Sequence, residues 1–258
     1  MTIADFLILM QIRGWAHFPE VLSAEFTRKL GLDVESAYER CRRLRIAKGI
    51  DAGTEGTAHH LLGNRDSLDE FLGLRPLHEP LRAFLGGPYI LNSYGAVLNW
   101  PGNAAYVNRV HRDIRTYFRG PPLMVNMLVM LDDFTEQNGA TLVLTGSHHI
   151  SERPSDEFFL RYADRFLGRA GDIVLFDSNV WHSAGINRSS TSRRALTLTW
   201  SRPLVKPQLD YPRYLPSDYA AELDEHLRQI LGFNSRVPAN LDEWYQPPEH
   251  RFYRADQG

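Results

Sequence analysis

The chain has 258 residues, which is enough for one large domain or two small ones with a substantial buried core. Its 29 lysines and arginines and 31 aspartates and glutamates give a formal charge of −2, so we expect no strong attraction to nucleic acid or to an anionic membrane. Cys41 is the only cysteine, which excludes an intrachain disulfide and a multi-cysteine zinc site and suits a reducing compartment.

The N-terminal third has the spacing of amphipathic helices. Residues 1–15 hold a short apolar run without the basic lead or cleavage site of a signal peptide, and the run is too short to cross a bilayer, so we expect a cytoplasmic protein. AEFTRKLG (24–31) and VESAYERCRRLRIAKG (34–49) predict two helices that stop at glycines. Residues 51–66, rich in Gly and Thr, predict a mobile loop, and residues 68–87 predict two short helices.

From residue 88 the pattern changes to short β-prone runs separated by turn residues. The runs are PYILNSYGAVLNW (88–100), LMVNMLVMLDDF (123–134), ATLVLTGS (140–147), GDIVLFD (171–177), VWHSAG (180–185) and RRALTLTW (193–200). Asn138-Gly139 predicts a hairpin turn, and residues 155–166 predict a helical insert. After Pro203 we expect one further helix at 217–232, with Ser217 as its N-cap.

These elements predict an α+β fold with a mainly β core. The antiparallel strands are numerous enough for a sandwich or a jelly roll, and the hairpin signals argue against a doubly wound parallel sheet. We expect a single domain over residues 1–258, with a helical part at about 1–86, a β core at about 87–202 and a helical tail at 203–258.

Three side chains in the β region suggest a metal site. His111 and Asp113 are two residues apart, and on a strand both would point to the same face. His182 could supply a second imidazole. Two imidazoles and one carboxylate leave about three coordination positions open, as in the facial triad of Fe(II) oxygenases. Alternatively, each histidine is structural, or His148 and His149 are the metal ligands.

The strand at 193–200 supplies a candidate partner for a carboxylate. One face carries an arginine and small or polar residues, and the other is bulky and apolar; the first face holds Arg193, Ala195, Thr197 and Thr199, and the second holds Arg194, Leu196, Leu198 and Trp200. The small face suits the lining of a cavity. If an iron centre used 2-oxoglutarate, an arginine fork would suit the far carboxylate of that cosubstrate, so we expect Arg193 to bind it.

Most of residues 14–200 resembles the phytanoyl-CoA dioxygenase family of Fe(II)- and 2-oxoglutarate-dependent oxygenases. The resemblance lies in GWAHFPEVLS (14–23), PLHEPLRAFLGGPYIL (76–91), VHRD (110–113), LDDFTEQNGATLVLTGSHH (131–149) and AGDIVLFDSNVWHSAGINRSSTSRRALTLTW (170–200). Eleven positions separate His182 from Arg193, which is the spacing that this family uses.

The resemblance implies a double-stranded β-helix (jelly-roll) core flanked by helices. It also implies that His111, Asp113 and His182 bind iron and that Arg193 binds the C5 carboxylate of 2-oxoglutarate. Asn126 falls on a strand where the family often offers a polar side chain to 2-oxoglutarate. A hydrogen bond from Asn126 to the neighbouring strand is the alternative, because a buried amide needs partners.

The activity implied is an oxidoreductase that uses Fe(II), 2-oxoglutarate and O2. It would hydroxylate an unactivated C–H bond of a small metabolite or natural-product intermediate and release succinate and CO2. Alternatives with the same cofactors are desaturation, cyclisation and epimerisation. Alternatives from other classes are a redox-inert jelly-roll metal isomerase and a non-catalytic binding protein. Arg109, Arg115 and Tyr117 could contact the substrate or lie at the surface, and His59 and His60 could belong to a lid or to a solvated loop.

Overall fold

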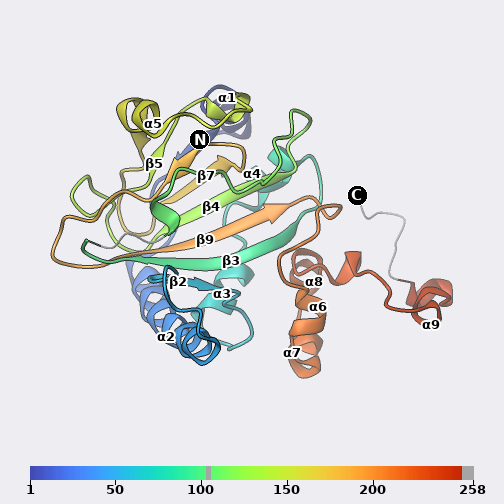
Figure 1. The fold of residues 1–258 in the computed structure, drawn as a ribbon. Helices are drawn as coiled ribbons and strands as arrows, with labels where there is room; N and C mark the ends of the chain where they lie inside the picture. The colour runs from blue at the N-terminus through green and yellow to red at the C-terminus, as the bar shows by residue number, and fades with distance from the viewer. Residues whose placement is uncertain (103–105, 252–258) are drawn as a thin grey trace.

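A six-stranded antiparallel sheet forms the centre of the computed structural model, which describes residues 1–102 and 106–251 (Figure 1). Its strands, in spatial order, are β1 (Trp15–Phe18), β7 (Ile173–Asp177), β4 (Met124–Met130), β9 (Arg193–Ser201), β3 (Ile90–Asn99) and β2 (Thr57–His59). A second antiparallel sheet has the order β6 (Asp164–Arg165), β5 (Leu142–Val143) and β8 (His182–Ser183).

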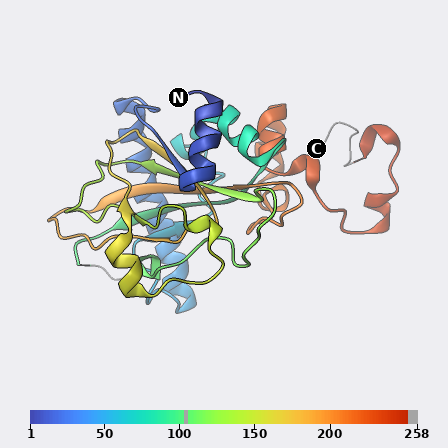
Figure 2. The same cartoon turned by 90° about the horizontal axis from the view of Figure 1, so that it is seen from above.

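The two faces of the large sheet bury different partners. One face packs with helices through a large apolar cluster. These helices are α1 (Ile3–Arg13), α2 (Ala24–Lys48), α3 (Ser67–Gly73) and α4 (His78–Leu85), and the cluster also includes Tyr211, Tyr219 and Ile230 of the tail. A second cluster joins the opposite face to the small sheet, and it includes Leu128, Met130, Val143, Phe166, Val174 and Phe176. Figure 2 shows α1 and α4 on one side of the central strands and α5 (Asp156–Tyr162) on the other. The predicted α+β fold with a jelly-roll core flanked by helices is therefore confirmed.

Helix α2 is continuous where the sequence predicted two helices. Gly31 lies inside it, and a Cβ at Gly31 would come within 2.8 Å of Nη1 of Arg194. The guanidinium of Arg194 forms ion pairs with Asp132 at 2.6 Å and with Glu35 at 3.0 Å. Gly31 therefore admits a packed arginine rather than ending a helix. The helix ends at Gly49, which adopts a φ of 69°.

The Asn138-Gly139 turn does not form the predicted hairpin. The backbone N–H of Ala140 donates to the carbonyl of Thr135 at 3.1 Å, which closes a turn. However, β4 before this turn belongs to the large sheet, and β5 after it belongs to the small sheet. The turn therefore carries the chain from one sheet to the other.

The N-terminal part supplies two edge strands that the sequence pattern did not reveal. β1 pairs with β7, and β2 pairs with β3 so that His59 lies opposite Gly95. Part of the predicted loop at 51–66 is therefore an edge strand of the large sheet. The helical insert at 155–166 is also shorter than predicted, because β6 follows α5 there.

The helix predicted at 217–232 is two helices, α7 (Ser217–Glu222) and α8 (Glu225–Ile230). Asp224 begins the second one, because its carboxylate accepts a hydrogen bond from the Leu227 N–H at 2.7 Å. Ser217 is not the N-cap, since Pro216 occupies that position without a side-chain bond.

The rest of the tail is made of short elements. They are α6 (Tyr211–Tyr214), η3 (Phe233–Ser235), α9 (Leu241–Trp244) and η4 (Pro248–His250), and η1 (Tyr106–Asn108) and η2 (Ser147–His149) occur earlier in the chain. Figures 1 and 2 both show α9 away from the body of the molecule. The last seven residues of the predicted tail, 252–258, lie outside the described part. Within the described ranges, no helix has the length and apolar character needed to span a bilayer.

Candidate metal and cosubstrate site

A backbone bridge brings the two candidate histidines together. The His111 N–H donates to the His182 carbonyl at 3.0 Å, and the His182 N–H donates to the His111 carbonyl at 2.9 Å. His182 lies in β8, whereas His111 forms an isolated bridge rather than part of the strand that the sequence pattern assumed. The Asp113 N–H donates to the Ser178 carbonyl at 3.2 Å. These backbone hydrogen bonds fix the three candidate ligands beside β8 of the small sheet.

One atom from each of His111, Asp113 and His182 lies within 4.8 Å of the other two. Among residues 1–102 and 106–251, this is the only group of three or more His, Cys, Asp or Glu side chains with such spacing. The Nε2 atoms of His111 and His182 lie 3.8 Å and 3.5 Å from the two carboxylate oxygens of Asp113. The arrangement therefore offers two nitrogen atoms and one oxygen atom to a single ion.

Backbone carbonyls orient both imidazole rings. His111 Nδ1 lies 2.7 Å from the Arg109 carbonyl, and His182 Nδ1 lies 3.0 Å from the Val180 carbonyl. If each Nδ1 carries the proton and donates it, each Nε2 presents a lone pair toward Asp113. Burial, together with the nearby His111, lowers the pKa of His182 to about 4. His182 is therefore neutral at pH 7, as a metal ligand must be.

Arg193 is a fully buried cation, and two of its three guanidinium nitrogen atoms lack a hydrogen-bonding partner among the described residues. Its exposed fraction is 2%, and its Nε and Nη1 atoms have no partner in the described residues. Its guanidinium stacks at 4.0 Å from the centre of the Phe134 ring. Burial lowers the pKa of Arg193 to about 9. Because an unpaired buried charge is costly, this site fits a carboxylate that binds from the cavity.

Asn126 connects the carboxylate of Asp113 to the large sheet. Its Nδ2 donates to Oδ2 of Asp113 at 2.7 Å, and its Oδ1 accepts a hydrogen bond from the Thr199 hydroxyl at 3.0 Å. Asn126 is 3% exposed, so both contacts lie in a protected environment. The bond across the strands is the alternative that the sequence left open. Thr199 was expected on the cavity face, but no sequence signal showed its contact with Asn126.

The triad, Arg193 and Asn126 line one cavity of about 370 Å³. The face of β9 that borders it carries Arg193, Ala195, Thr197 and Thr199, as the alternation of the strand predicted. Opposite, Trp200 and Leu196 are buried in the helix-facing cluster.

The cavity lining also includes His59, which the sequence suggested could belong to a lid or to a solvated loop, and Tyr106. His59 faces the cavity from β2, and its Nε2 lies 3.1 Å from the hydroxyl of Tyr106. A Cβ at Gly95 would lie 3.3 Å from Nδ1 of His59, so the glycine leaves room for this imidazole. The sequence pattern predicts a loop at His59 and carries no signal for Tyr106. Gln208, from the tail, also lines this cavity.

The rival histidines have a different role. Nε2 of His148 and Nε2 of His149 lie 3.1 Å and 3.0 Å from the Gln11 carbonyl, near the end of α1. Neither belongs to the candidate metal-binding group. Both therefore bind an exposed helix carbonyl, as a structural contact.

Of the three flanking residues, only Arg115 lines the cavity. The Arg112 guanidinium stacks 5.1 Å from the centre of the Tyr117 ring, and Tyr117 lines a different cavity. Arg109 contributes its carbonyl to His111. The structure thus separates side chains that the sequence could not distinguish.

The family model "Phytanoyl-CoA dioxygenase (PhyH)" matches residues 11–195. The uncharacterized protein Rv1501 of Mycobacterium tuberculosis is 40% identical over 153 residues, which cover 59% of this chain and 56% of that protein. The multifunctional dioxygenase prhA of Penicillium brasilianum is 31% identical over 166 residues, covering 59% of this chain and 54% of that protein. Each match thus spans little more than half the length of the relative.

Solved structures share the fold. AviO1 from Streptomyces viridochromogenes Tue57 superposes with a TM-score of 0.58 at 23% identity, covering 80% of this chain and 97% of that one. The non-haem alpha-ketoglutarate-dependent epimerase SnoN from nogalamycin biosynthesis has a TM-score of 0.56 at 16% identity, covering 77% and 81%. At these identities the likeness establishes the architecture.

Proposed function

This chain belongs to the phytanoyl-CoA dioxygenase family, and we propose that it is an Fe(II)- and 2-oxoglutarate-dependent dioxygenase. Its reaction would be hydroxylation of an unactivated C–H bond in a small metabolite or natural-product intermediate, with release of succinate and CO2. The single observation that carries this proposal is Arg193. A buried guanidinium with unpaired nitrogen atoms lies in the same cavity as a His-Asp-His group, and 2-oxoglutarate offers a carboxylate for it.

The residues fit both groups chemically. His111, Asp113 and His182 would hold the iron, and Arg193 would receive the C5 carboxylate of 2-oxoglutarate. Ferrous iron with 2-oxoglutarate and O2 supplies the oxidising power for C–H cleavage, which no protein side chain can provide. The family membership makes the chain an oxidoreductase; the cofactors and the site residues are part of this proposal.

The chain's own residues would orient and shield these groups. The Arg109 and Val180 carbonyls hold the imidazoles in the tautomer that frees Nε2. Asn126 would hold Asp113 by one oxygen, which leaves the other oxygen for the ion, and could also contact 2-oxoglutarate. Leu128 and Phe176 line the same cavity and would help exclude water.

Other outcomes at the same site are desaturation, cyclisation and epimerisation. SnoN is described as an epimerase, which supports epimerisation as an alternative reaction for this chain. A redox-inert isomerase would have no need for Arg193, and a binding protein would have no need for an open triad.

We also propose that residues 1–258 form a single oxygenase domain that acts in the cytoplasm.

Succinate formation tests this function. Purified protein with Fe(II), 2-oxoglutarate and O2 should convert 2-oxoglutarate slowly to succinate even without substrate, and a candidate substrate should accelerate this conversion. His182→Ala should abolish succinate formation, whereas His149→Gln, a change of the rival histidine, should preserve it. Absence of succinate from well-folded, iron-loaded protein, with or without substrates, would contradict the proposal and favour a binding protein.

A further inference from the structure

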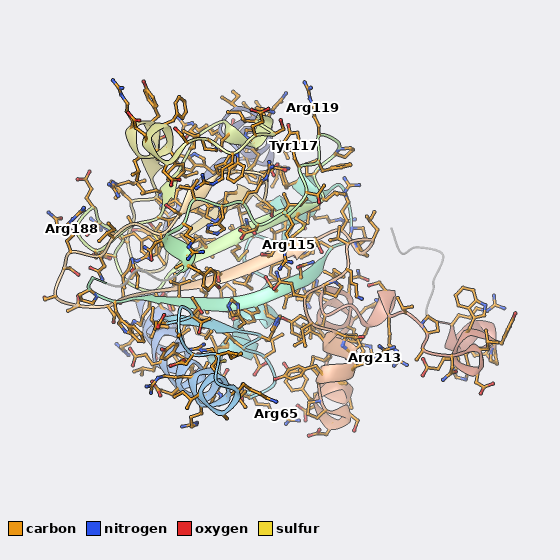
Figure 3. The ribbon with its side chains drawn as sticks, in the orientation of Figure 1. Arg65, Arg115, Tyr117, Arg119, Arg188 and Arg213 are labelled. Carbon is orange, nitrogen blue, oxygen red and sulfur yellow. The ribbon has the colours of Figure 1, made fainter. Side chains whose placement is uncertain are left out.

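We infer that the cavity accepts an anionic substrate, whose carboxylate or phosphate group binds the guanidinium of Arg115. This inference rests on the proposed function, because it assumes that 2-oxoglutarate occupies Arg193. Arg115 lines the cavity, is exposed, and has no bonding partner among the described residues. Figure 3 shows Arg115 in front of the central strands, whereas Arg119 and Arg188 lie at the periphery.

The segment after the triad places Arg115 on the same side as Asp113. The N–H groups of Asp113 and Ile114 both lie 3.2 Å from the Ser178 carbonyl, which fixes the backbone there. Ile114 lines the neighbouring cavity, while Asp113 and Arg115 line the metal cavity. His111 and Arg112 line the metal cavity as well, so Arg115 shares this cavity with the proposed iron ligands.

Arg112 also lines the metal cavity, but protein groups hold its guanidinium. Its guanidinium stacks 4.5 Å from the centre of the Trp181 ring and donates to the Ser151 carbonyl at 2.6 Å. These contacts use its charge and its hydrogen bonds on protein groups. With Arg193 assigned to 2-oxoglutarate and Arg112 engaged with protein groups, Arg115 is the cavity arginine whose guanidinium is available to a substrate.

The charges of the site leave Arg115 without a counter-ion. Asp113 and one carboxylate of 2-oxoglutarate would balance the two charges of ferrous iron, and Arg193 would balance the second carboxylate. Asp113 is the only acidic side chain among the described residues that line this cavity. Arg112, the other cation of this lining without a carboxylate partner, is held by the Trp181 ring and the Ser151 carbonyl. A substrate with an oxyanion would supply the counter-ion that Arg115 lacks, and an arginine fork suits either a carboxylate or a phosphate.

Another part of the cavity lining can accept a polar part of the same molecule. The His59 imidazole and the Tyr106 hydroxyl line the cavity together with Ser93 and Thr197. The three hydroxyl groups are uncharged at pH 7. Packing around His59, and then the nearby Arg45 cation, lower the pKa of its imidazole, which favours the neutral form. A substrate that carries both an anionic group and a polar group therefore matches this lining.

Calorimetry with matched compounds tests this inference. Protein saturated with Fe(II) and 2-oxoglutarate, without oxygen, would be titrated with a panel of small acids, each paired with its primary amide and with the phosphate ester of the corresponding alcohol. Prior saturation prevents these anions from binding at Arg193. At least one oxyanion should bind about tenfold or more tightly than its amide, as expected for a charged hydrogen-bonded pair. Whether the acid or the phosphate binds more tightly identifies the group.

Two variants assign the preference to a residue. Arg115→Gln should lose the preference for the anion, and Arg115→Lys should keep part of it, because lysine retains the charge without the fork. Arg119→Gln is the matched control, since Arg119 is an exposed arginine in the same loop but lines the other cavity. No anion preference anywhere in the panel, or a preference that persists in Arg115→Gln, would overturn the inference. Failure of 2-oxoglutarate to bind at all would instead refute the proposed function.

Discussion

Two neighbouring arginines at the start of β9 have opposite environments. Arg194 is satisfied by Asp132 and Glu35, whereas the buried Nε and Nη1 atoms of Arg193 have no partner in the described chain. Burying a charge without a counter-ion costs several kcal/mol in a protein interior. The fold tolerates this at Arg193 because the guanidinium borders a cavity that an anion can enter. The unsatisfied residue therefore marks the site, and the satisfied one stabilises the junction between α2 and the sheet.

Asn126→Leu tests the positioning of Asp113. Leucine keeps a comparable volume but removes the donor 2.7 Å from Oδ2, so the carboxylate loses the contact that orients it. We expect Mn(II) affinity, measured by electron paramagnetic resonance without 2-oxoglutarate, to fall by about tenfold to a hundredfold. Thr197→Val, a change in the same cavity away from Asp113, should leave this affinity unchanged. Equal Mn(II) affinity in Asn126→Leu and the parent protein would refute the positioning role.

At the scale of elements, local signals predicted the strands that matter most. The alternation along RRALTLTW assigned the correct face to the cavity because β9 is long enough for a period of two to be visible. β2 has only three residues, so its alternation is invisible and His59 was assigned to a loop. Gly31 resembles a helix stop, and only the position of Arg194, distant in sequence, explains why the helix continues. Predictions failed where the deciding contact is not local.

Helix α8 packs against α4 through a histidine whose partial burial favours its neutral form. The ring of His226 lies 4.8 Å from the ring of His78 on α4, and Arg75 pairs with Asp224 at 2.6 Å beside it. Burial, then the Arg75 and His78 charges, lower the pKa of His226 to about 4. In the unfolded chain the pKa of His226 is near 6.5, so this histidine binds more protons in the unfolded state than in the folded state between pH 6.5 and 4. Stability due to neutral His226 is therefore present above pH 6.5 and is lost as the pH falls toward 4.

His226→Gln should remove this contribution to the pH dependence. Between pH 7.5 and pH 5.5, the free energy of unfolding of the parent protein should fall by about 1 kcal/mol more than that of the variant, a figure that allows for solvent screening of the half-buried ring. Denaturant unfolding at both pH values measures the difference, and comparison with the variant cancels the other histidines. If both proteins lose the same free energy, protonation of His226 does not control the docking of α8.

Over the whole molecule, the candidate site lies where separate parts of the chain meet. The small sheet supplies His182, the segment before β4 supplies His111 and Asp113, and the large sheet supplies Arg193. The fold class and these four side chains could be predicted from motif order and spacing. The outer wall could not, because His59, Tyr106 and Gln208 meet only after β2, η1 and the tail have packed around the core.

A metal ion bound at this junction should stabilise the entire fold. At a Mn(II) concentration about 100 times the Kd, binding to the folded state adds about 2.7 kcal/mol, which corresponds to a rise in Tm of roughly 5–10 °C. Differential scanning calorimetry should detect this rise in the parent protein and in His149→Gln, and it should be absent in His182→Ala. A similar rise in His182→Ala would place the metal elsewhere.

The most direct test of the central claim is an anaerobic titration of Fe(II)-loaded protein with 2-oxoglutarate, followed by its visible charge-transfer band. The parent protein and Arg188→Gln, which alters an exposed arginine at the periphery (Figure 3), should both develop the band and saturate at similar concentrations. Arg193→Gln should need about a hundredfold more 2-oxoglutarate, because it removes the buried partner of a carboxylate, while its affinity for the metal stays the same. A band that saturates in Arg193→Gln as it does in the parent protein would contradict the account.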